Sequence, residues 1–442
     1  MGGGRATLTG ALIALAVGGM PEARAEVSDA PALRVDFKTG VAAEDAPGAA
    51  TGTARSDLRF GVIRSTKGSS VEVSLGAWVE AGGRAKGGLD HLRLSYARTS
   101  RQSALTAHLR VEEATLSSEA SLIDPVTGDF VTVVDPGRRR AMQAAMSLRT
   151  GIGERVEFNL DLRRGATRYI GTVSPSYNDS DSWSAAVTAK LRVSPVAHLR
   201  GEFGVHDERT LDGLDSQRRV GFGRVELGYD LNPVTSFSVG VGHSWIDQSG
   251  AAGLVDRRGT TLVAGVTREH RRGHVGLRYA RTVESSGTRD LIEVSARLEQ
   301  PRGELKGSLG YTRTAQHSGP IAALTYRHEM ARGRIHLSAA QKFSTSGTGS
   351  PRAVSETRLR LDREVTARGT IRIEAGYQAV GAAPMGGAAV SRASVALTYD
   401  HRLTRDWSLE GGLRHLATRR AGQSGSRRNT IFVTLSRSFM SR

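Results

Sequence analysis

The sequence predicts an all-β protein, a transmembrane antiparallel up-and-down β-barrel of about 20–22 strands. Three observations predict this fold class. Apolar and polar residues alternate over segments of about ten residues, short and long links alternate between these segments, and a secretion signal precedes them.

The alternation is clear in Val156–Arg163, where the sequence VEFNLDLR places an apolar residue at every second position. Trp183–Val193 repeats this pattern. Because successive side chains of a strand point to opposite faces, such segments form a sheet with one apolar and one polar face. A sheet can span a bilayer only as a closed barrel, which has no unpaired backbone edge.

The N-terminus predicts export from the cytoplasm. Leu8–Val17 is a short apolar run, and Ala23-Arg24-Ala25 is a small-residue cleavage site. We therefore expect residues 1–25 to be a cleaved signal peptide and residues 26–442 to be a single barrel domain. Strand-like sequence begins soon after Glu26, so no plug domain is expected.

Composition agrees with this prediction. The chain has no cysteine, 53 glycines and a mean hydropathy of -0.30, which excludes a helical membrane protein. The formal net charge is +17. Because the cations are spread over the chain rather than clustered in one motif, we do not expect a nucleic-acid partner.

Twenty segments carry the strand pattern, and two weaker ones, Leu33–Phe37 and Leu58–Val62, bring the number to 22. The clear segments are Val71–Val79, Leu92–Tyr96, Leu105–Val111, Met142–Leu148, Val156–Leu162, Trp183–Val193, Leu199–Val205, Val225–Leu231, Phe237–Trp245, the region of Leu262, Val275–Tyr279, Ile292–Leu298, Leu305–Tyr311, Leu324–Tyr326, Ile335–Phe343, Thr357–Leu361, Ile371–Tyr377, Ala393–Tyr399, Trp407–Leu413 and Ile431–Phe439.

The links between these segments alternate in length. Short, turn-rich links include Ser194–Val196 and Asn232–Thr235, and longer polar links include Arg164–Asp181 and Asp207–Arg218. Short periplasmic turns and longer outer loops are typical of outer-membrane barrels. The longest insert, residues 112–139, is expected to be an outer hairpin or a segment folded inward as a constriction.

Aromatic residues are expected to form two girdles on the lipid-facing side. The periplasmic girdle would contain Tyr96, Tyr229, Tyr326, Tyr399 and Trp407, and the outer girdle Trp183, Trp245, Tyr279, Tyr311 and Tyr377.

The last segment, Ile431–Phe439, resembles the terminal strand of Gram-negative outer-membrane barrels, which alternates in polarity and ends in an aromatic residue. Tyr399–Gly411 resembles a strand–turn–strand unit of porin-like barrels. The resemblance implies an outer-membrane location, contact with lipid and lipopolysaccharide, and recognition of the strand ending at Phe439 by the barrel-assembly machinery. Three residues follow Phe439, which departs from the usual pattern.

The polar face is expected to line a water-filled lumen with a surplus of cations. The alternative is that these charges pair across strands and only solvate the wall. The candidate lumen cations are Arg163, Lys190, Arg192, Arg200, Arg224, Arg278, Arg297, Arg358, Arg360 and Arg372.

No catalytic motif is found, so we predict no enzyme activity, no cofactor and no metal site. Asn178–Asp181 is acidic enough to contact calcium, but a lone acidic loop of this kind is usually solvated. The predicted function is passive passage of small or anionic solutes through a porin-like channel. The alternative is a structural or surface-interaction barrel that binds lipopolysaccharide or an acidic polysaccharide, or serves in its export.

Overall fold

The structure, a computed structural model, describes residues 32–46, 49–82, 86–115, 137–172, 178–211, 216–250, 253–315, 317–345, 351–382, 389–422 and 424–441. The predicted signal peptide and its cleavage site lie outside these residues. No helix among the described residues is long and apolar enough to cross a membrane.

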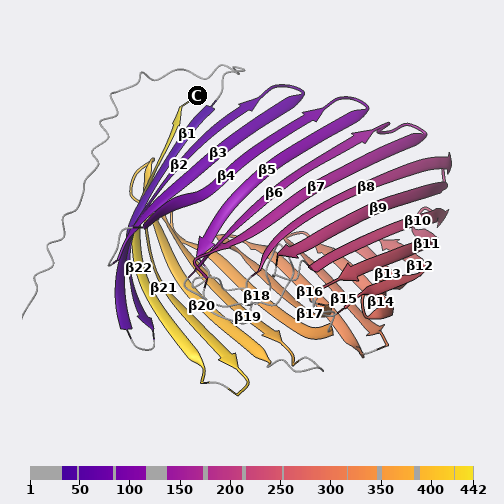
Figure 1. Cartoon of the computed structure of the whole chain (residues 1–442). Helices are drawn as coiled ribbons and strands as arrows, with labels where there is room; N and C mark the ends of the chain where they lie inside the picture. The colour runs from indigo at the N-terminus through magenta and orange to yellow at the C-terminus, as the bar shows by residue number, and fades with distance from the viewer. Residues whose placement is uncertain are drawn as a thin grey trace, which may run out of the picture.

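The described residues form one closed antiparallel sheet of 22 strands, which confirms the predicted fold class (Figure 1). Each strand pairs with its neighbours in sequence, and β1 pairs with β22 to close the barrel. The two weaker segments that the sequence suggested belong to β1 and β2.

The strands have these bounds: β1 Ala32–Ala46, β2 Ala49–Ser65, β3 Ser69–Ala81, β4 Lys86–Thr99, β5 Ser103–Thr115, β6 Arg138–Thr150, β7 Val156–Ile170, β8 Asp179–Ser194, β9 Ala197–Leu211, β10 Ser216–Asn232, β11 Thr235–Ser249, β12 Val255–His270, β13 Gly273–Glu284, β14 Gly287–Gln300, β15 Gly303–Arg313, β16 Ser318–Met330, β17 Gly333–Thr345, β18 Pro351–Thr366, β19 Gly369–Val380, β20 Val390–Arg402, β21 Trp407–Arg420 and β22 Ser426–Ser441.

Two-residue turns join several strands at one end of the barrel, for example residues 195–196 and 233–234. We call this end the periplasmic end, because outer-membrane barrels place their short turns there. The opposite end is called the outer end.

The predicted apolar alternation marks the lipid-facing side of the wall. Val156, Phe158 and Leu162 on β7 are exposed, as is Val187 on β8. Leu160 pairs with Val187 across the two strands, and paired residues of antiparallel strands point to the same side. The apolar residues therefore cover the outside of the barrel, and the polar residues between them face inward.

Register places the predicted girdle aromatics on this lipid-facing side. Tyr279 and Tyr311 both pair with Ile292 across β14, and Tyr326 pairs with Leu305 near the periplasmic end. The inner face has its own apolar cluster. Val354, Val380 and Val390 pair across β18–β20 at the outer end, and each is buried.

The longer polar links are shorter than the sequence suggested. The predicted link Arg164–Asp181 is largely strand, because β7 runs to Ile170 and β8 begins at Asp179. Cross-strand pairs explain the extension. Arg168 Nη2 lies 2.8 Å from Asp181 Oδ1 beyond the apolar band, so polar side chains support the ladder there.

The same correction applies to Asp207–Arg218, since β9 ends at Leu211 and β10 begins at Ser216. Of the insert 112–139, residues 112–115 belong to β5 and residues 138–139 to β6. Its remaining described residue is Gly137, and the predicted hairpin itself falls outside the described residues.

Candidate functional site

All ten candidate cations lie on the inner face of the barrel. Arg163, for example, follows the exposed Leu162 and pairs with Ser184. The other nine candidates also alternate with lipid-facing residues along their strands, so they face inward as well. They are Lys190, Arg192, Arg200, Arg224, Arg278, Arg297, Arg358, Arg360 and Arg372. Their role in selecting a solute stays a prediction.

The most strongly paired charges form the Asp362 cluster, which consists of Asp362 with Arg334, Arg360 and Arg372 on β17–β19. The Asp362 carboxylate lies 3.0 Å from Arg334 Nε, 2.9 Å from Arg360 Nε and 2.8 Å from Arg372 Nε. Its side chain is only 10% exposed. Arg360 Nη1 is also 3.5 Å from Glu374 Oε1, so carboxylates hold these arginines against the wall.

Carboxylates pair with further candidate cations. Glu202 lies 2.7 Å from Arg224 Nη2 and 3.5 Å from Arg200 Nη2, and Glu304 lies 2.6 Å from Arg297 Nε. The alternative left open by the sequence, pairing within the wall, therefore describes part of the set. The candidates with a carboxylate oxygen within 4.0 Å are Arg200, Arg224, Arg297, Arg358, Arg360 and Arg372.

The other four candidates, Arg163, Lys190, Arg192 and Arg278, have no carboxylate oxygen within 4.0 Å among the described residues. Three of them lie on two adjoining strands, and we call Arg163, Lys190 and Arg192 the β7–β8 cations. Arg192 Nη1 donates a hydrogen bond of 3.2 Å to the carbonyl oxygen of Gly153, a neutral group.

The neighbouring strand adds positive charge to this region. Lys190 pairs directly with Arg200, and Arg192 pairs with His198. Like charges directly opposite one another destabilise a sheet. The His198 ring is accommodated by Gly228, because a Cβ at that position would lie 2.3 Å from His198 Cε1. Glu157 lies directly opposite Lys190 on β7, but no carboxylate oxygen of the described residues comes within 4.0 Å of the β7–β8 cations, whereas three arginines lie within 3.0 Å of Asp362.

A third charged group, which was not predicted from the sequence, lies on β2–β4. Arg55 Nη2 lies 2.8 Å from Asp57 Oδ1, and Arg59 Nη2 lies 3.1 Å from Asp90 Oδ2. The Arg55 guanidinium also stacks 5.0 Å from the ring centroid of Trp78, which is buried on the inner face. Arg55, Asp57 and Arg59 occupy alternate positions of β2, and this two-residue period could have placed them on the inner face. The segment was only weakly predicted as a strand, so the group was not recognised.

The carboxylates of the acidic segment Asn178–Asp181 form hydrogen bonds and ion pairs with other residues of the protein. Asp179 Oδ1 accepts a hydrogen bond of 2.8 Å from the backbone nitrogen of Tyr169, and Asp181 pairs with Arg168. In the described parts of the chain, no group of three or more histidines and acidic residues is arranged to hold a metal ion.

Comparison with solved structures finds the same fold in receptor barrels. The siderophore receptor PirA from Acinetobacter baumannii matches with a TM-score of 0.57 at 8% identity, covering 94% of this chain and 81% of that chain. BauA, the ferric preacinetobactin receptor from Acinetobacter baumannii, matches with a TM-score of 0.56 at 9% identity over 93% and 80% of the two chains. The siderophore receptor PirA from Pseudomonas aeruginosa matches with a TM-score of 0.54 at 10% identity over 92% and 80%.

No protein-family model matches the sequence, and no curated protein matches it. The chain forms a closed 22-stranded antiparallel β-barrel, and in fold it resembles the barrels of siderophore receptors. The structures it resembles are receptors rather than enzymes.

Proposed function

We propose that this barrel is a passive channel that carries small solutes across the outer membrane with a preference for anions. The observation that supports the preference is the set of β7–β8 cations on the inner face, which have no carboxylate oxygen within 4.0 Å among the described residues. Charged side chains on a pore wall commonly set ion selectivity. Barrels of 16–18 strands already enclose an aqueous channel, so a wall of 22 strands is wide enough for one.

The likeness to siderophore receptors supports transport across the outer membrane in general. A receptor-like function, uptake of a metal chelate after tight binding, is the competing form of this proposal. It differs in requiring a binding step that saturates, whereas a passive channel conducts in proportion to concentration.

The direct test is electrical. The chain from Glu26 would be refolded and inserted into planar bilayers, and single-channel conductance and reversal potential would be recorded across two potassium chloride gradients. We expect steady conductance and a reversal potential shifted toward that of chloride. A folded barrel without conductance would contradict the channel and would favour a receptor or a surface-interaction barrel.

The role of the β7–β8 cations has its own variant and control. The triple variant Arg163→Gln, Lys190→Gln and Arg192→Gln should lose most of the anion preference while it still conducts. A matched control removes the same charge from periplasmic turns. Its substitutions are Arg271→Gln, Arg302→Gln and Arg405→Gln. Equal loss of preference in both variants would show that overall charge, and not this part of the wall, sets selectivity.

We also propose that the barrel-assembly machinery reads the last strand through Phe439. Phe439 pairs with Val35 on β1 and lies under the Arg437 guanidinium, 4.0 Å from its ring centroid. Phe439→Ala should lower the yield of heat-modifiable barrel in cells, whereas refolding of the purified variant in detergent should be unaffected.

A further inference from the structure

We propose that the periplasmic end of β12–β19 docks onto a carboxylate-bearing polymer, the peptide stems of peptidoglycan, through an arc of arginines on four neighbouring turns. This inference rests on the proposed outer-membrane location and not on whether the lumen conducts, so the two proposals can fail separately.

The first observation is a turn position that is repeated around this end of the barrel. Six described turns at the periplasmic end have two residues, and they join β8–β9, β10–β11, β12–β13, β14–β15, β16–β17 and β18–β19. In each turn, the carbonyl oxygen of the second residue accepts a hydrogen bond of 2.6–2.8 Å from a backbone nitrogen of the next hairpin. The second residues are therefore structurally equivalent. They are Val196, Val234, Arg272, Arg302, Arg332 and Arg368.

The turn geometry itself does not require arginine at this position. Val196 and Val234 accept the same hydrogen bond through their carbonyl oxygens. A glycine follows each of the four arginines, and it has a packing reason. A Cβ at Gly273, Gly303 or Gly333 would lie within 2.3 Å of a carbonyl oxygen of the next strand. The glycines are thus explained by the fold, whereas the arginine side chains are not.

The second observation is that these arginines lack an acidic partner. We call the following four residues the turn arginines: Arg272, Arg302, Arg332 and Arg368. All four are exposed, and no carboxylate oxygen of the described residues lies within 4.0 Å of their guanidinium nitrogens. Glutamates at the ends of β14, β16 and β18 are nearby in the chain, but they too stay beyond this distance. One of them, Glu299, pairs instead with Arg297 at 2.8 Å.

The third observation is the regular spacing of the turn arginines. Their turns belong to consecutive hairpins of the sheet, so neighbouring turns are two strands apart. With about 4.8 Å between strands, an arginine recurs about every 10 Å over an arc of about 30 Å. An extended polyanion can contact several of these arginines at once, and linked contacts of this kind strengthen one another.

The composition of the turns favours a polymer over a folded protein. The other residue of each turn is not a large apolar one. These residues are Arg271, Pro301, Ala331 and Ala367. A protein interface usually has an apolar centre within a polar rim, and these turns offer no such centre. Arginine binds carboxylates through paired hydrogen bonds, and the peptide stems of peptidoglycan present carboxylates beneath the outer membrane.

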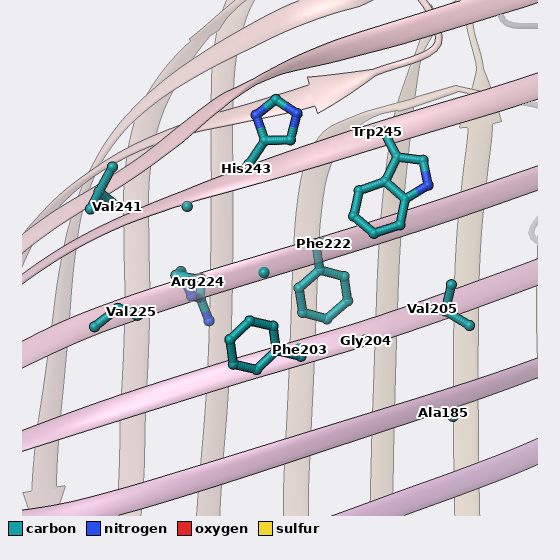
Figure 2. A pocket seen from close by; sticks show the side chains of 12 residues that line it. Ala185, Phe203, Gly204, Val205, Phe222, Arg224, Val225, Val241, His243 and Trp245 are labelled. Carbon is teal, nitrogen blue, oxygen red and sulfur yellow. The ribbon is translucent and has the colours of Figure 1, made fainter.

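The aromatic groove on the lipid-facing side of β8–β11 is a contrasting case. Figure 2 shows Phe203 and Trp245 on the strands that line it. Hydrocarbon against the apolar exterior of the barrel accounts for a groove of this kind. The turn arginines lie beyond the strand ends, so hydrocarbon cannot account for them.

The test is co-sedimentation of the detergent-purified barrel with purified peptidoglycan sacculi at about 0.1 M salt, where the screening length is about 10 Å. Replacing all four turn arginines by glutamine should weaken binding about tenfold, because four exposed ion pairs are lost. The matched control removes four exposed cations from the outer end and should bind like the unmodified protein. Its substitutions are Arg257→Gln, Arg258→Gln, Arg313→Gln and Arg427→Gln.

A second variant tests the proposal by a gain of binding. Val196→Arg and Val234→Arg together extend the arc at equivalent turn positions, and they should strengthen binding about threefold. Sacculi whose carboxylates have been amidated should retain little of any variant. Heat-modifiable migration in gels verifies that each variant is folded before the comparison is made.

Three results would overturn the proposal: equal binding by the turn-arginine and outer-end variants, equal binding to amidated sacculi, or binding to immobilised polyglutamate but not to sacculi. The last result would identify an acidic polypeptide as the partner instead.

Discussion

The Asp362 cluster and the β7–β8 cations are two parts of one inner wall that treat positive charge differently. In the Asp362 cluster, three arginines from β17–β19 converge on one carboxylate. On β7 and β8, Arg163, Lys190 and Arg192 have no carboxylate within 4.0 Å among the described residues, and Lys190 directly opposes Arg200. An inward-facing charge can therefore either stabilise the wall or remain available to a solute.

The largest effect should come from removing the shared carboxylate. Asp362→Asn would leave three arginine side chains facing one another, and we expect the free energy of unfolding to fall by about 2–3 kcal/mol. Urea unfolding in lipid vesicles, followed by tryptophan fluorescence, measures this change. The control is Asp256→Asn, whose carboxylate pairs with Arg258 but is 61% exposed, and it should change stability little. Equal effects would mean that the cluster is no more stabilising than a surface pair.

A smaller effect is expected where β9 and β10 approach each other closely. Gly228→Ala places a methyl group against the His198 ring, and the ring must move, which should cost about 1 kcal/mol. Gly201→Ala on the lipid-facing side is the control, because its Cβ would meet only Phe203 Cε2 at 3.8 Å. If both variants unfold at the same urea concentration, the His198 contact does not constrain the wall.

A carboxylate placed opposite one of the β7–β8 cations should stabilise the wall. Ser184 pairs with Arg163, so Ser184→Asp should raise the free energy of unfolding by up to about 1 kcal/mol through a cross-strand ion pair. Ser238→Asp on β11 introduces the same charge opposite Gly228 and Gly265, and it should give no such gain. A gain in both variants would argue against pairing as the cause.

The smallest effect concerns salt. If the β7–β8 cations set selectivity by electrostatic attraction, the anion preference should weaken as potassium chloride rises from about 0.1 M to about 1 M, because the screening length falls from about 10 Å to about 3 Å. Reversal potentials at a constant concentration ratio measure this. A preference that is independent of salt would indicate a size-based filter instead.

The sequence predicted the lipid-facing side in detail because that side must match hydrocarbon at every second residue. Val156–Leu162 shows why, since each apolar residue there must face outward wherever the strand sits in the wall. The ends of strands were harder to predict. Arg164–Ile170 was assigned to a link because it lacks apolar alternation, but backbone pairing with β6 continues to Ile170, and the Arg168–Asp181 ion pair supports this part of the ladder.

The sequence could predict which side of the wall each candidate cation faces, but not which carboxylate it pairs with. Alternation placed Arg163 and Arg372 on the same side of the wall, and the two look alike in sequence. Arg372 lies 2.8 Å from Asp362, ten residues earlier in the chain, whereas Arg163 has no such partner among the described residues. Partner choice depends on register between strands, and a shift of one residue would exchange the faces.

The alternation of apolar and polar residues was enough to predict a barrel with an apolar exterior and a charged inner face, because a two-residue period is a local property of each strand. Only the tertiary structure decided that β1 and β22 close the barrel, which cations are neutralised, and that the turn arginines form one arc at the periplasmic end. These features require residues that are distant in sequence to meet at a defined register, and no local pattern encodes that meeting.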